Sequence, residues 1–578
     1  MTALLDRDDI DFTVFDWLEL HARSDRETVE AFLDLSEKVA AESFLSHYKL
    51  ADVDEPSIES GDVRICGAVK EALAQYAELG LFGAGFPEVL GGIGLPHLAC
   101  TASFAYFSAA NIATSGYVML TVANARLLAT FGTAAQIETF AKPQIEGRWF
   151  GTMCLSEPQA GSSLADIRTC AEFEQEDELG TRYRLIGNKM WISGGDQDAS
   201  ENIVHLVLAK VRSDDGSIPD DTSGLSLFVV PKVLPDGTRN DIAVAGLNHK
   251  LGYRGTSNCA LNFGENGGAV GWIVGRPGDG LRQMFQMMNE ARIAVGLGAA
   301  ALGYRAYLLS LDYAKERKQG RTPGTRGGAP IAIAGHADVK RMLLTQKAYV
   351  EGAMALCLYS AHLVDVSDAE TDALLGLLTP IAKTWPSEYA LAANDLAIQI
   401  HGGYGYTREY HVEQLWRDNR LNAIHEGTTG IQANDLVGRK ILRDDSGLTA
   451  LRRRMSATLD AARTDPELAG FTAPLEHALQ QTLAAADYLR AQSPARAIEN
   501  AALFLKGTGH VVVAWLMLDQ LVSCRKHVDA DPRGTQRYAG KLAAYRQFYA
   551  HDLPITGVWL RVDTYAMSDY AATDIDVL

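Results

Sequence analysis

The spacing of apolar residues predicts helices in the first part of the chain. From about residue 27 to residue 145, apolar residues recur three and four positions apart, as in EALAQYAELGLF and in the alanine-rich stretch 98–131. This spacing gathers apolar side chains on one face of a helix. The pairs Phe86-Pro87 and Gly91-Gly92 interrupt the pattern and predict a loop inside a helical domain.

The pattern changes near Gly151. The segments TRYRLIGNKMWIS, NIVHLVLAKV, GLSLFVVP and NCALNF are short and rich in β-branched and aromatic residues, and clusters of Gly, Asp, Ser and Pro separate them. Such segments are typical of strands, so residues 151–275 are expected to form an all-β domain. Within the first segment, Gly187-Asn188 predicts a tight hairpin turn.

After Gly280 the helical pattern returns. Residues 281–317 predict one unusually long helix, followed by a Gly/Pro/Thr-rich loop over 321–330 and further helices over 336–364 and 372–400. The block 446–578 is helical with polar breaks, notably DADPRGTQ. The order of helices, strands and helices argues against a Rossmann sheet. We expect a multi-domain α protein with a central β domain, divided as 1–150, 151–275, 276–445 and 446–578.

Charge and cysteine content narrow the classes of function. The chain has 53 basic and 72 acidic residues, a formal charge of -19, which disfavours binding to nucleic acid or to an anionic membrane surface. Seven scattered cysteines without a CxxC pair predict neither a disulfide scaffold nor a metal site. The acidic start and the lack of an apolar run near ~18 residues indicate a soluble cytoplasmic protein without a membrane span.

Gly296-Leu297-Gly298-Ala299-Ala300-Ala301 nominally fits a dinucleotide-binding fingerprint. That site needs a strand before the first glycine, because the tight turn points a helix N-terminus at the pyrophosphate. Here the preceding residues MFQMMNEARIAV are helical in pattern. The glycines therefore predict a small-residue face on which another helix packs, and a nicotinamide site is rejected.

Two motifs in the predicted β domain are candidates for ligand contact. CLSEPQAGSS, residues 154–163, combines a proline turn with hydroxyls, which suits an anionic or carbonyl-bearing ligand, although a simple polar turn is an alternative. In KMWISGG, residues 189–195, Trp191 could lie against a flat cofactor ring or could instead close a barrel core.

Two further motifs lie in the predicted bundle. QIHGGYGY, residues 399–406, has glycines that let the backbone lie close to a ligand. Glu426-Gly427-Thr428-Thr429 places a carboxylate just before a hydroxyl N-cap and the helical run IQANDLVGRKIL. An isolated Glu is most often a solvated surface group, so the context of Glu426 decides its role.

Together, the four motifs resemble the acyl-CoA dehydrogenase family. The patterns C-x-[ST]-E-P-x-A-G-S, K-x-W-I-[ST]-x-G, Q-x-x-G-G-x-G-Y and E-G-T-x-x-I-Q occur in family order from Cys154 to Gln432. The resemblance implies an N-terminal helical domain, a β-barrel or sandwich, and a four-helix bundle. The helical block after residue 445 is similar to an added domain in the long bacterial branch of the family.

The resemblance also implies FAD as cofactor, held between the β domain and the bundle and reached in part by a neighbouring subunit. The residues implied in FAD binding are Cys154, Leu155, Ser156, Ser162, Trp191, Ser193, Arg317, Gln319, Gln399, Gly402, Gly403, Thr428 and Gln432. Those implied near the acyl-CoA are Ser162, Asn289, Arg292 and Gly427.

The implied reaction is α,β-dehydrogenation of an acyl-CoA thioester to a trans-2-enoyl-CoA. Glu426 would remove the α-proton while the β-hydrogen leaves as hydride to flavin N5. The backbone N–H of Glu426 and a ribityl hydroxyl would bind the thioester carbonyl. We expect burial to raise the pKa of Glu426. The implied electron acceptor is an electron-transfer flavoprotein, and the implied assembly is a homodimer or homotetramer.

Three positions depart from the family pattern: His425 replaces a common Tyr, Gly430 replaces Gln or Glu, and the loop after Arg317 reads KQGRTPGTRGG. His425 could tune Glu426 or simply fill space. An acyl-CoA oxidase and, less favoured, a non-catalytic DNA-binding flavoprotein are alternatives. The latter would want a basic added domain, whereas the block after residue 445 has similar numbers of acids and bases. The sequence does not identify the acyl group of the substrate.

Overall fold

The structure is a computed structural model that describes residues 3–213, 215–322, 324, 327–528, 532–567, 570 and 572–577. It forms two compact units. The first comprises Met1–Leu33, His97–Ala109 and Arg292–Leu578, and the second comprises Asp34–Pro96 and Ala110–Ala291. The two units do not test the four domain ranges expected from the sequence, which stay predictions.

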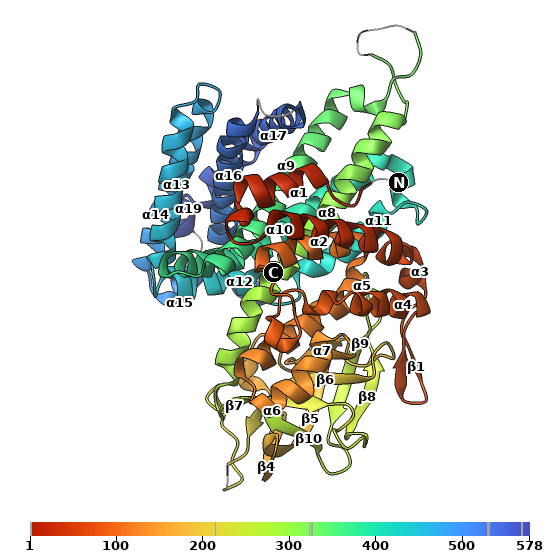
Figure 1. The fold of residues 1–578 in the computed structure, drawn as a ribbon. Helices are drawn as coiled ribbons and strands as arrows, with labels where there is room; N and C mark the ends of the chain where they lie inside the picture. The colour runs from red at the N-terminus through yellow and green to blue at the C-terminus, as the bar shows by residue number, and fades with distance from the viewer. Residues whose placement is uncertain are drawn as a thin grey trace. The chain divides into compact units, whose positions relative to one another are not determined.

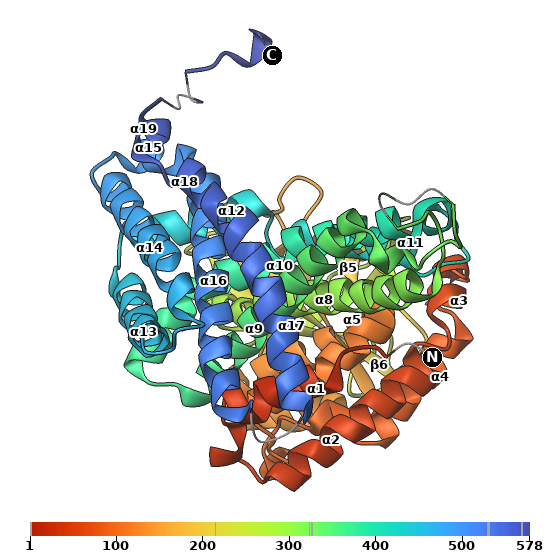
Figure 2. The ribbon, with the colours of Figure 1, turned by 90° about the horizontal axis from the view of Figure 1, so that it is seen from above.

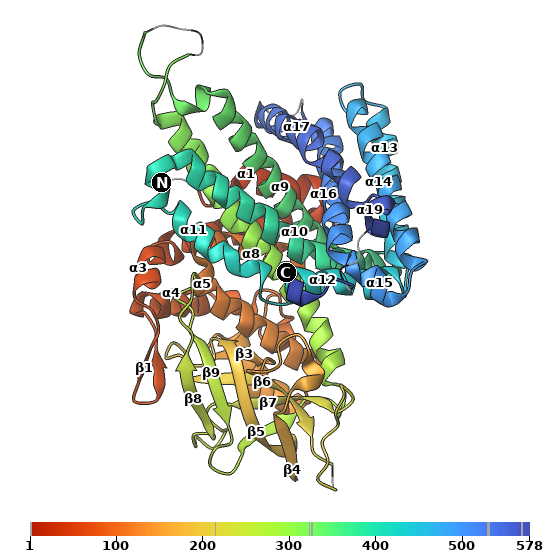
Figure 3. The ribbon, with the colours of Figure 1, turned by 180° about the vertical axis from the view of Figure 1, so that it is seen from behind.

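The second unit contains a β-barrel (Figures 1 and 3). Its strands follow the order β10-β7-β6-β4-β5-β9-β8, and β3 pairs with β6. Because β10 also pairs with β5, the strands β10, β7, β6, β4 and β5 close into a ring. The bounds are β3 Trp149–Cys154, β4 Cys170–Asp177, β5 Gly180–Ser193, β6 Asn202–Val211, β7 Leu225–Pro231, β8 Ile242–Leu247, β9 Asn258–Phe263 and β10 Ala269–Ile273. The predicted β domain is confirmed.

The hairpin turn predicted at Gly187-Asn188 is wrong. β5 continues through both residues, and Gly187 pairs with Phe263 of β9. A Cβ atom at Gly187 would lie 2.3 Å from Oγ1 of Thr169. The glycine is therefore needed because another segment packs against the strand, a requirement that looks the same in sequence as a turn.

Helices cover part of the barrel within the second unit. The long helix α5 (His97–Phe131) and the segment η6 (Ile137–Ala141) contribute Leu128 and Phe140 to a core shared with Leu206, Val229 and Trp272 of the strands. The same unit holds α3 (Tyr48–Val53), α4 (Gly67–Glu78), α6 (Ala134–Gln136), α7 (Lys142–Ile145) and the hairpin β1 (Ser57–Glu59) and β2 (Asp62–Arg64). The predicted loop near residues 86–92 is present, with short turns η4 (Leu81–Gly83) and η5 (Glu88–Leu90) beside it.

The first unit contains a bundle of long helices. The predicted helix over 281–317 is confirmed as α8 (Gly280–Glu316), which begins in the second unit. The next two predicted helices are α9 (Ala337–Val366) and α10 (Ala369–His401), followed by α11 (Val412–Asn419) and α12 (Thr429–Asp435). A Cβ atom at Gly296 would lie 1.9 Å from the carbonyl oxygen of Ala382 in α10. The glycine-rich stretch in α8 is thus a helix-packing face, as predicted.

The C-terminal helices belong to the same unit as the bundle, and Figure 2 shows α16 and α17 side by side. They are α13 (Ser446–Arg463), α14 (Ala469–Arg490), α15 (Pro494–Glu499), α16 (Ala501–His527), α17 (Pro532–His551), α18 (Thr556–Trp559) and α19 (Val562–Met567). Of the predicted polar break DADPRGTQ, residues 529–531 lie outside the described residues. The ammonium of Lys541 in α17 lies 2.5 Å from Asp9 of α1 (Arg7–Asp11) and 3.3 Å from Glu351 of α9. This buried ion-pair cluster joins the N-terminal segment to the added helices.

Within the described residues, α8 and α16 are long and apolar enough to cross a bilayer by length and composition. In each helix, 83% of the apolar window is buried inside the protein. A buried core helix meets the same two criteria. The two helices are therefore weak evidence for a membrane span.

Candidate active site

Glu426 lies in the loop between η10 (Arg420–Ala423) and α12, in an unusual backbone conformation. Its φ is +53°, in the left-handed region that non-glycine residues rarely occupy. Gly427 follows with φ +90°. Such conformations persist only where surrounding contacts hold them.

Hydrogen bonds from two helices hold this loop. The ammonium of Lys383 in α10 donates to the carbonyl oxygen of Gly427 at 2.7 Å. The side-chain amide of Gln432 in α12 donates to the carbonyl oxygen of Glu426 at 2.8 Å. The hydroxyl of Thr429 donates to Glu388 of α10 at 3.0 Å. The carbonyl groups of Glu426 and Gly427 are thus both fixed by hydrogen bonds.

The surroundings of Glu426 raise the pKa of its carboxyl above the usual range. The side chain is half-buried, and the loss of water around its carboxyl is the main cause of the raised pKa. The positive charges of Arg292 and Lys383 oppose this rise. The guanidinium of Arg292 is itself buried and bonds Asp435 at 2.8 Å. The rise agrees with the expectation from the sequence and is typical of a general base.

The backbone N–H of Glu426 has no hydrogen-bond acceptor in the part of the chain that the structure describes. His425 next to it bonds Asn422 at 3.0 Å through its ring. Burial, and secondarily the charge of Lys383, lower the pKa of His425 to about 3, so the ring is neutral at physiological pH. The loop therefore presents a carboxyl group and a free N–H donor beside a neutral ring.

In the second unit, Trp191 is exposed rather than part of the core. Its side chain is 63% exposed and its φ is +66°. The pairing of β5 with β9 shifts register between Lys189 and Ile192, and this bulge turns the indole outward. The alternative that Trp191 closes the barrel core is wrong, and an exposed indole fits contact with a flat ring.

A buried ion pair joins the two predicted β-domain motifs. The sequence did not indicate this contact. The ammonium of Lys189 donates to Glu157 at 2.9 Å and to the carbonyl oxygens of Leu155 and Leu208 at 3.0 and 2.8 Å. Burial alone would raise the pKa of Glu157, but Lys189 and hydrogen bonds lower it to about 2. Since Met190 N–H also donates to Ser156 at 2.9 Å, the 154–163 turn is fixed beside the Trp191 strand.

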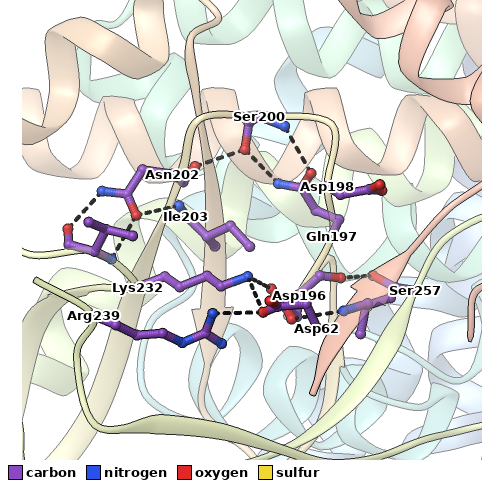
Figure 4. Close-up of polar contacts among 12 residues, drawn as sticks. Asp62, Asp196, Gln197, Asp198, Ser200, Asn202, Ile203, Lys232, Arg239 and Ser257 are labelled. Atoms are coloured by element: carbon purple, nitrogen blue, oxygen red, sulfur yellow. Dashed lines mark hydrogen bonds and ion pairs between the residues drawn. The ribbon is translucent and has the colours of Figure 1, made fainter. Parts of the chain in front are cut away.

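The loop that follows Ser193 is fixed by a second polar cluster (Figure 4). Asp196 pairs with Lys232 and accepts a bond from the N–H of Val63 at 3.1 Å. Asp62 completes the cluster with contacts of 3.1 Å to Lys232 and 2.7 Å to Arg239. These contacts anchor the chain directly after Trp191 and Ser193.

The other predicted β-domain residues differ in accessibility. The side chain of Cys154 is fully buried, with its sulfur 3.8 Å from the ring of His205. Any flavin contact of Cys154 is therefore limited to its backbone. Leu155, Ser156 and Ser193 are partly exposed, and Ser162 is exposed.

The residues expected to reach a partner's cofactor are exposed in the first unit: Arg317, Gln319, Gln399, Gly402 and Gly403. The guanidinium of Arg317 lies over the ring of Tyr404, 5.8 Å from its centroid. A Cβ atom at Gly402 or Gly403 would meet nothing within 4 Å, so open space lies beside both. Of the predicted 321–330 loop, residues 323, 325 and 326 lie outside the described residues.

The remaining predicted residues lie around the Glu426 loop or in α8. Thr428 is exposed at the N-cap of α12, and Asn289 is half-buried in α8. The amide oxygen of Gln432 is buried without a hydrogen-bond partner within the described residues. Its contact with FAD stays a prediction. Because Arg292 is paired with Asp435, its contact with CoA stays a prediction.

Comparison with known proteins identifies the family of the chain. Four family models match: the acyl-CoA dehydrogenase N-terminal domain over 30–148, the middle domain over 152–265, the C-terminal domain over 278–441, and the acetyl-CoA dehydrogenase C-terminal-like domain over 451–568. The chain is 36% identical to 3-methylmercaptopropionyl-CoA dehydrogenase of Ruegeria pomeroyi, over 86% of each chain. It is also 36% identical to the broad-specificity linear acyl-CoA dehydrogenase FadE5 of Mycobacterium tuberculosis, over 90% of this chain and 88% of that protein.

Solved structures share the fold. Caenorhabditis elegans ACDH-11 in complex with C11-CoA matches with a TM-score of 0.81 at 21% identity, over 95% of this chain and 91% of that chain. An acyl-CoA dehydrogenase complexed with FAD from Bacillus anthracis matches with a TM-score of 0.72 at 21% identity, over 94% and 90%. On the family models and the two relatives, the chain belongs to the acyl-CoA dehydrogenase family, whose members are oxidoreductases that act on CH–CH bonds with FAD as cofactor.

Proposed function

We propose that this protein oxidises an acyl-CoA thioester to the trans-2-enoyl-CoA, with Glu426 as the base that removes the α-proton. The observation that carries this proposal is the Glu426 loop. The carboxyl has a raised pKa, its residue is held at a left-handed φ, and its own N–H has no acceptor within the described residues. A surface glutamate needs none of these features.

The residues present fit FAD. Trp191 offers an exposed indole face, and the partly exposed Ser156 and Ser193 offer hydroxyl groups nearby in the same barrel. Gly402 and Gly403 leave open space where a cofactor could approach the backbone. We propose that Trp191, Ser156 and Ser193 hold the flavin part of FAD, and that Gly402 and Gly403 contact the adenosine end of a partner subunit's FAD. The chemistry that FAD supplies when bound is acceptance of the substrate's β-hydrogen as a hydride.

The chain's own residues carry the proton and the charge. In the proposed step the Glu426 carboxylate takes the α-proton of the thioester, and its N–H donates to the thioester oxygen, where negative charge develops. The positive charges of Lys383 and Arg292 oppose the effect of burial on the pKa of the carboxyl and so favour its ionised form. The ring of His425 is neutral at physiological pH and does not compete for the proton.

The surroundings of the reaction are also proposals. We propose an electron-transfer flavoprotein as electron acceptor, a homodimer or homotetramer as the assembly, and the cytoplasm as location. The two curated relatives act on 3-methylmercaptopropionyl-CoA and on linear acyl-CoA, as their names state. Both kinds of thioester are therefore candidate substrates.

The test is anaerobic titration of the purified yellow protein with these acyl-CoA thioesters, recording loss of flavin absorbance. We expect the wild-type flavin to bleach with at least one of them, and Glu426→Gln to retain FAD without bleaching. Glu476→Gln on α14 is the control for the same chemical change. Normal bleaching of Glu426→Gln would overturn the assignment of the base. Hydrogen peroxide formed in step with product under air would identify an oxidase instead.

A further inference from the structure

We infer that Lys383 is a positioning residue for the Glu426 loop and supplies the positive charge that keeps the base ionised, an inference that rests on the function proposed above. None of the motifs in the sequence includes this lysine. It lies in the interior of α10, more than forty positions before the residues that it would position.

The side chain of Lys383 is buried, with 0% exposure, and its ammonium reaches the loop directly. Its one hydrogen-bond acceptor within the described residues is the carbonyl oxygen of Gly427 at 2.7 Å. A buried ammonium normally pairs with a carboxylate or several acceptors, because losing water is costly. Lys383 is therefore held in an unfavourable place by the fold around it.

Lys189 shows what a buried lysine with a structural function looks like in this same protein. Its ammonium uses three acceptors, one of them the carboxylate of Glu157 at 2.9 Å. Three acceptors match the three N–H groups of an ammonium. Lys383 has two N–H groups without an acceptor in the part of the chain that the structure describes, and burial lowers its pKa to about 8. A lysine retained under these conditions is better explained by the loop it contacts than by stability.

The contact fixes the orientation of the loop at the point where it is strained. Lys383 holds the carbonyl of Gly427, and Gln432 holds the carbonyl of Glu426, so two consecutive peptide groups are restrained. Glu426 has φ +53° and Gly427 has φ +90°. Loss of the Lys383 bond would free Gly427 to rotate and let Glu426 relax out of the left-handed region.

The charge of Lys383 acts on the carboxyl itself. The ionisable groups that affect Lys383 are Glu426 and Glu388, which are acidic, and Arg292, which is basic. His425 is neutral, since its pKa is lowered to about 3. Lys383 and Arg292 together oppose the effect of burial on Glu426. Removing the Lys383 charge should therefore raise the pKa of Glu426 further.

The experiment compares four variants by anaerobic single-turnover bleaching of the FAD-bound protein across pH. Lys383→Met removes the donor and the charge, Lys383→Gln removes the charge but keeps an N–H donor, and Lys383→Arg keeps both. Lys340→Met, at an exposed site on α9, controls for the loss of one positive charge. Flavin content and thermal unfolding check that each variant is folded.

We expect Lys383→Met to bleach at least about tenfold more slowly than wild type. We expect the acidic limb of its rate–pH profile to move up by about one pH unit. Lys383→Arg should keep the wild-type limb and Lys383→Gln should show the raised limb, while Lys340→Met should match wild type in both. If Lys383→Met does not hold FAD, the test is the comparison of Lys383→Gln with Lys383→Arg. An acidic limb at the same pH in both variants would overturn the inference.

The outcomes separate this inference from the proposed function. The proposed function is wrong if none of the acyl-CoA thioesters bleaches the wild-type flavin, or if Glu426→Gln bleaches normally. Wild type that bleaches, Glu426→Gln that does not, and Lys383→Met with a wild-type rate and limb leave the function standing and overturn the positioning of the loop by Lys383.

Discussion

Glu426 and Trp191 share a left-handed backbone conformation, with φ of 53° and 66°. Six non-glycine residues within the described chain have positive φ, and these two are the residues that the motifs assign to the base and to the flavin ring. Backbone strain of about 1 kcal/mol or more at each must be offset by surrounding contacts. For Glu426 these are the bonds from Lys383 and Gln432, and for Trp191 the bulge in β5.

The strain at Glu426 predicts that stability and activity can be separated. Glu426→Gly should raise the free energy of unfolding by about 1 kcal/mol, because glycine adopts this φ without steric cost. The same variant should abolish bleaching. Ser367→Gly is the matched control, since Ser367 ends α9 with φ +45°. It should stabilise by a similar amount with activity unchanged. Loss of stability in Glu426→Gly, measured by thermal unfolding, would contradict this account.

The exposed indole of Trp191 predicts a loss of cofactor affinity on truncation. Trp191→Ala should weaken FAD binding at least about tenfold and alter the flavin absorption spectrum, because a stacked ring contact is lost. Phe173→Ala removes another exposed aromatic side chain, on β4 of the same barrel, and should change neither quantity. Equilibrium dialysis of FAD with each variant measures the difference. Equal affinities in the two variants would rule out contact between Trp191 and the flavin.

The Glu157–Lys189 pair predicts a dependence of stability on acid. Lys189 and hydrogen bonds lower the pKa of Glu157 from 4.5 to about 2, so its stabilisation is present above pH 4.5 and lost as the pH falls towards 2. Lys189→Met leaves a buried carboxylate without its cation, which costs about 3 kcal/mol. This cost should be largest above pH 4.5 and should shrink as the pH falls towards 2, measured by urea unfolding followed by tryptophan fluorescence at several pH values.

A control separates this effect from simple loss of a buried lysine. Lys210 in β6 is also buried, but its ammonium bonds the carbonyl oxygen of Ala165 at 2.6 Å rather than a carboxylate. Lys210→Met should lower the free energy of unfolding by an amount that changes little over the same pH range. The same pH dependence of the loss in both variants would show that Glu157 is not the titrating group.

The packing of Gly296 predicts a large effect from a single methyl group. Gly296→Ala should lower the free energy of unfolding by about 3 kcal/mol, because its Cβ would lie 1.9 Å from the carbonyl oxygen of Ala382. Gly438→Ala, where a Cβ meets nothing within 4 Å, should be neutral or slightly stabilising. Neither variant should alter nicotinamide binding, which is expected to be absent. If Gly296→Ala is as stable as wild type, α8 and α10 do not pack as closely at this position as the structure shows.

Features set by short segments could be predicted from the sequence. The helical spacing over 281–317 predicted α8 as one helix, and the β-branched segments predicted β5, β6, β7 and β9. The same reasoning failed at Gly187, because a glycine required by Thr169 eighteen positions earlier resembles a turn glycine. These helices and strands were predictable because the pattern of each is set by residues close together in the sequence.

For the site, the sequence by itself determined the candidates: the carboxylate before a helix N-cap, the tryptophan followed by serine and glycines, and the glycine-rich end of a helix. Only the tertiary structure decided how these residues are supported. Lys383 and Gln432 bond the Glu426 loop, Lys189 pairs with Glu157, and Cys154 is buried against His205. The physical reason is that a side chain's charge, exposure and backbone strain depend on neighbours brought together by folding, which residue order alone does not specify.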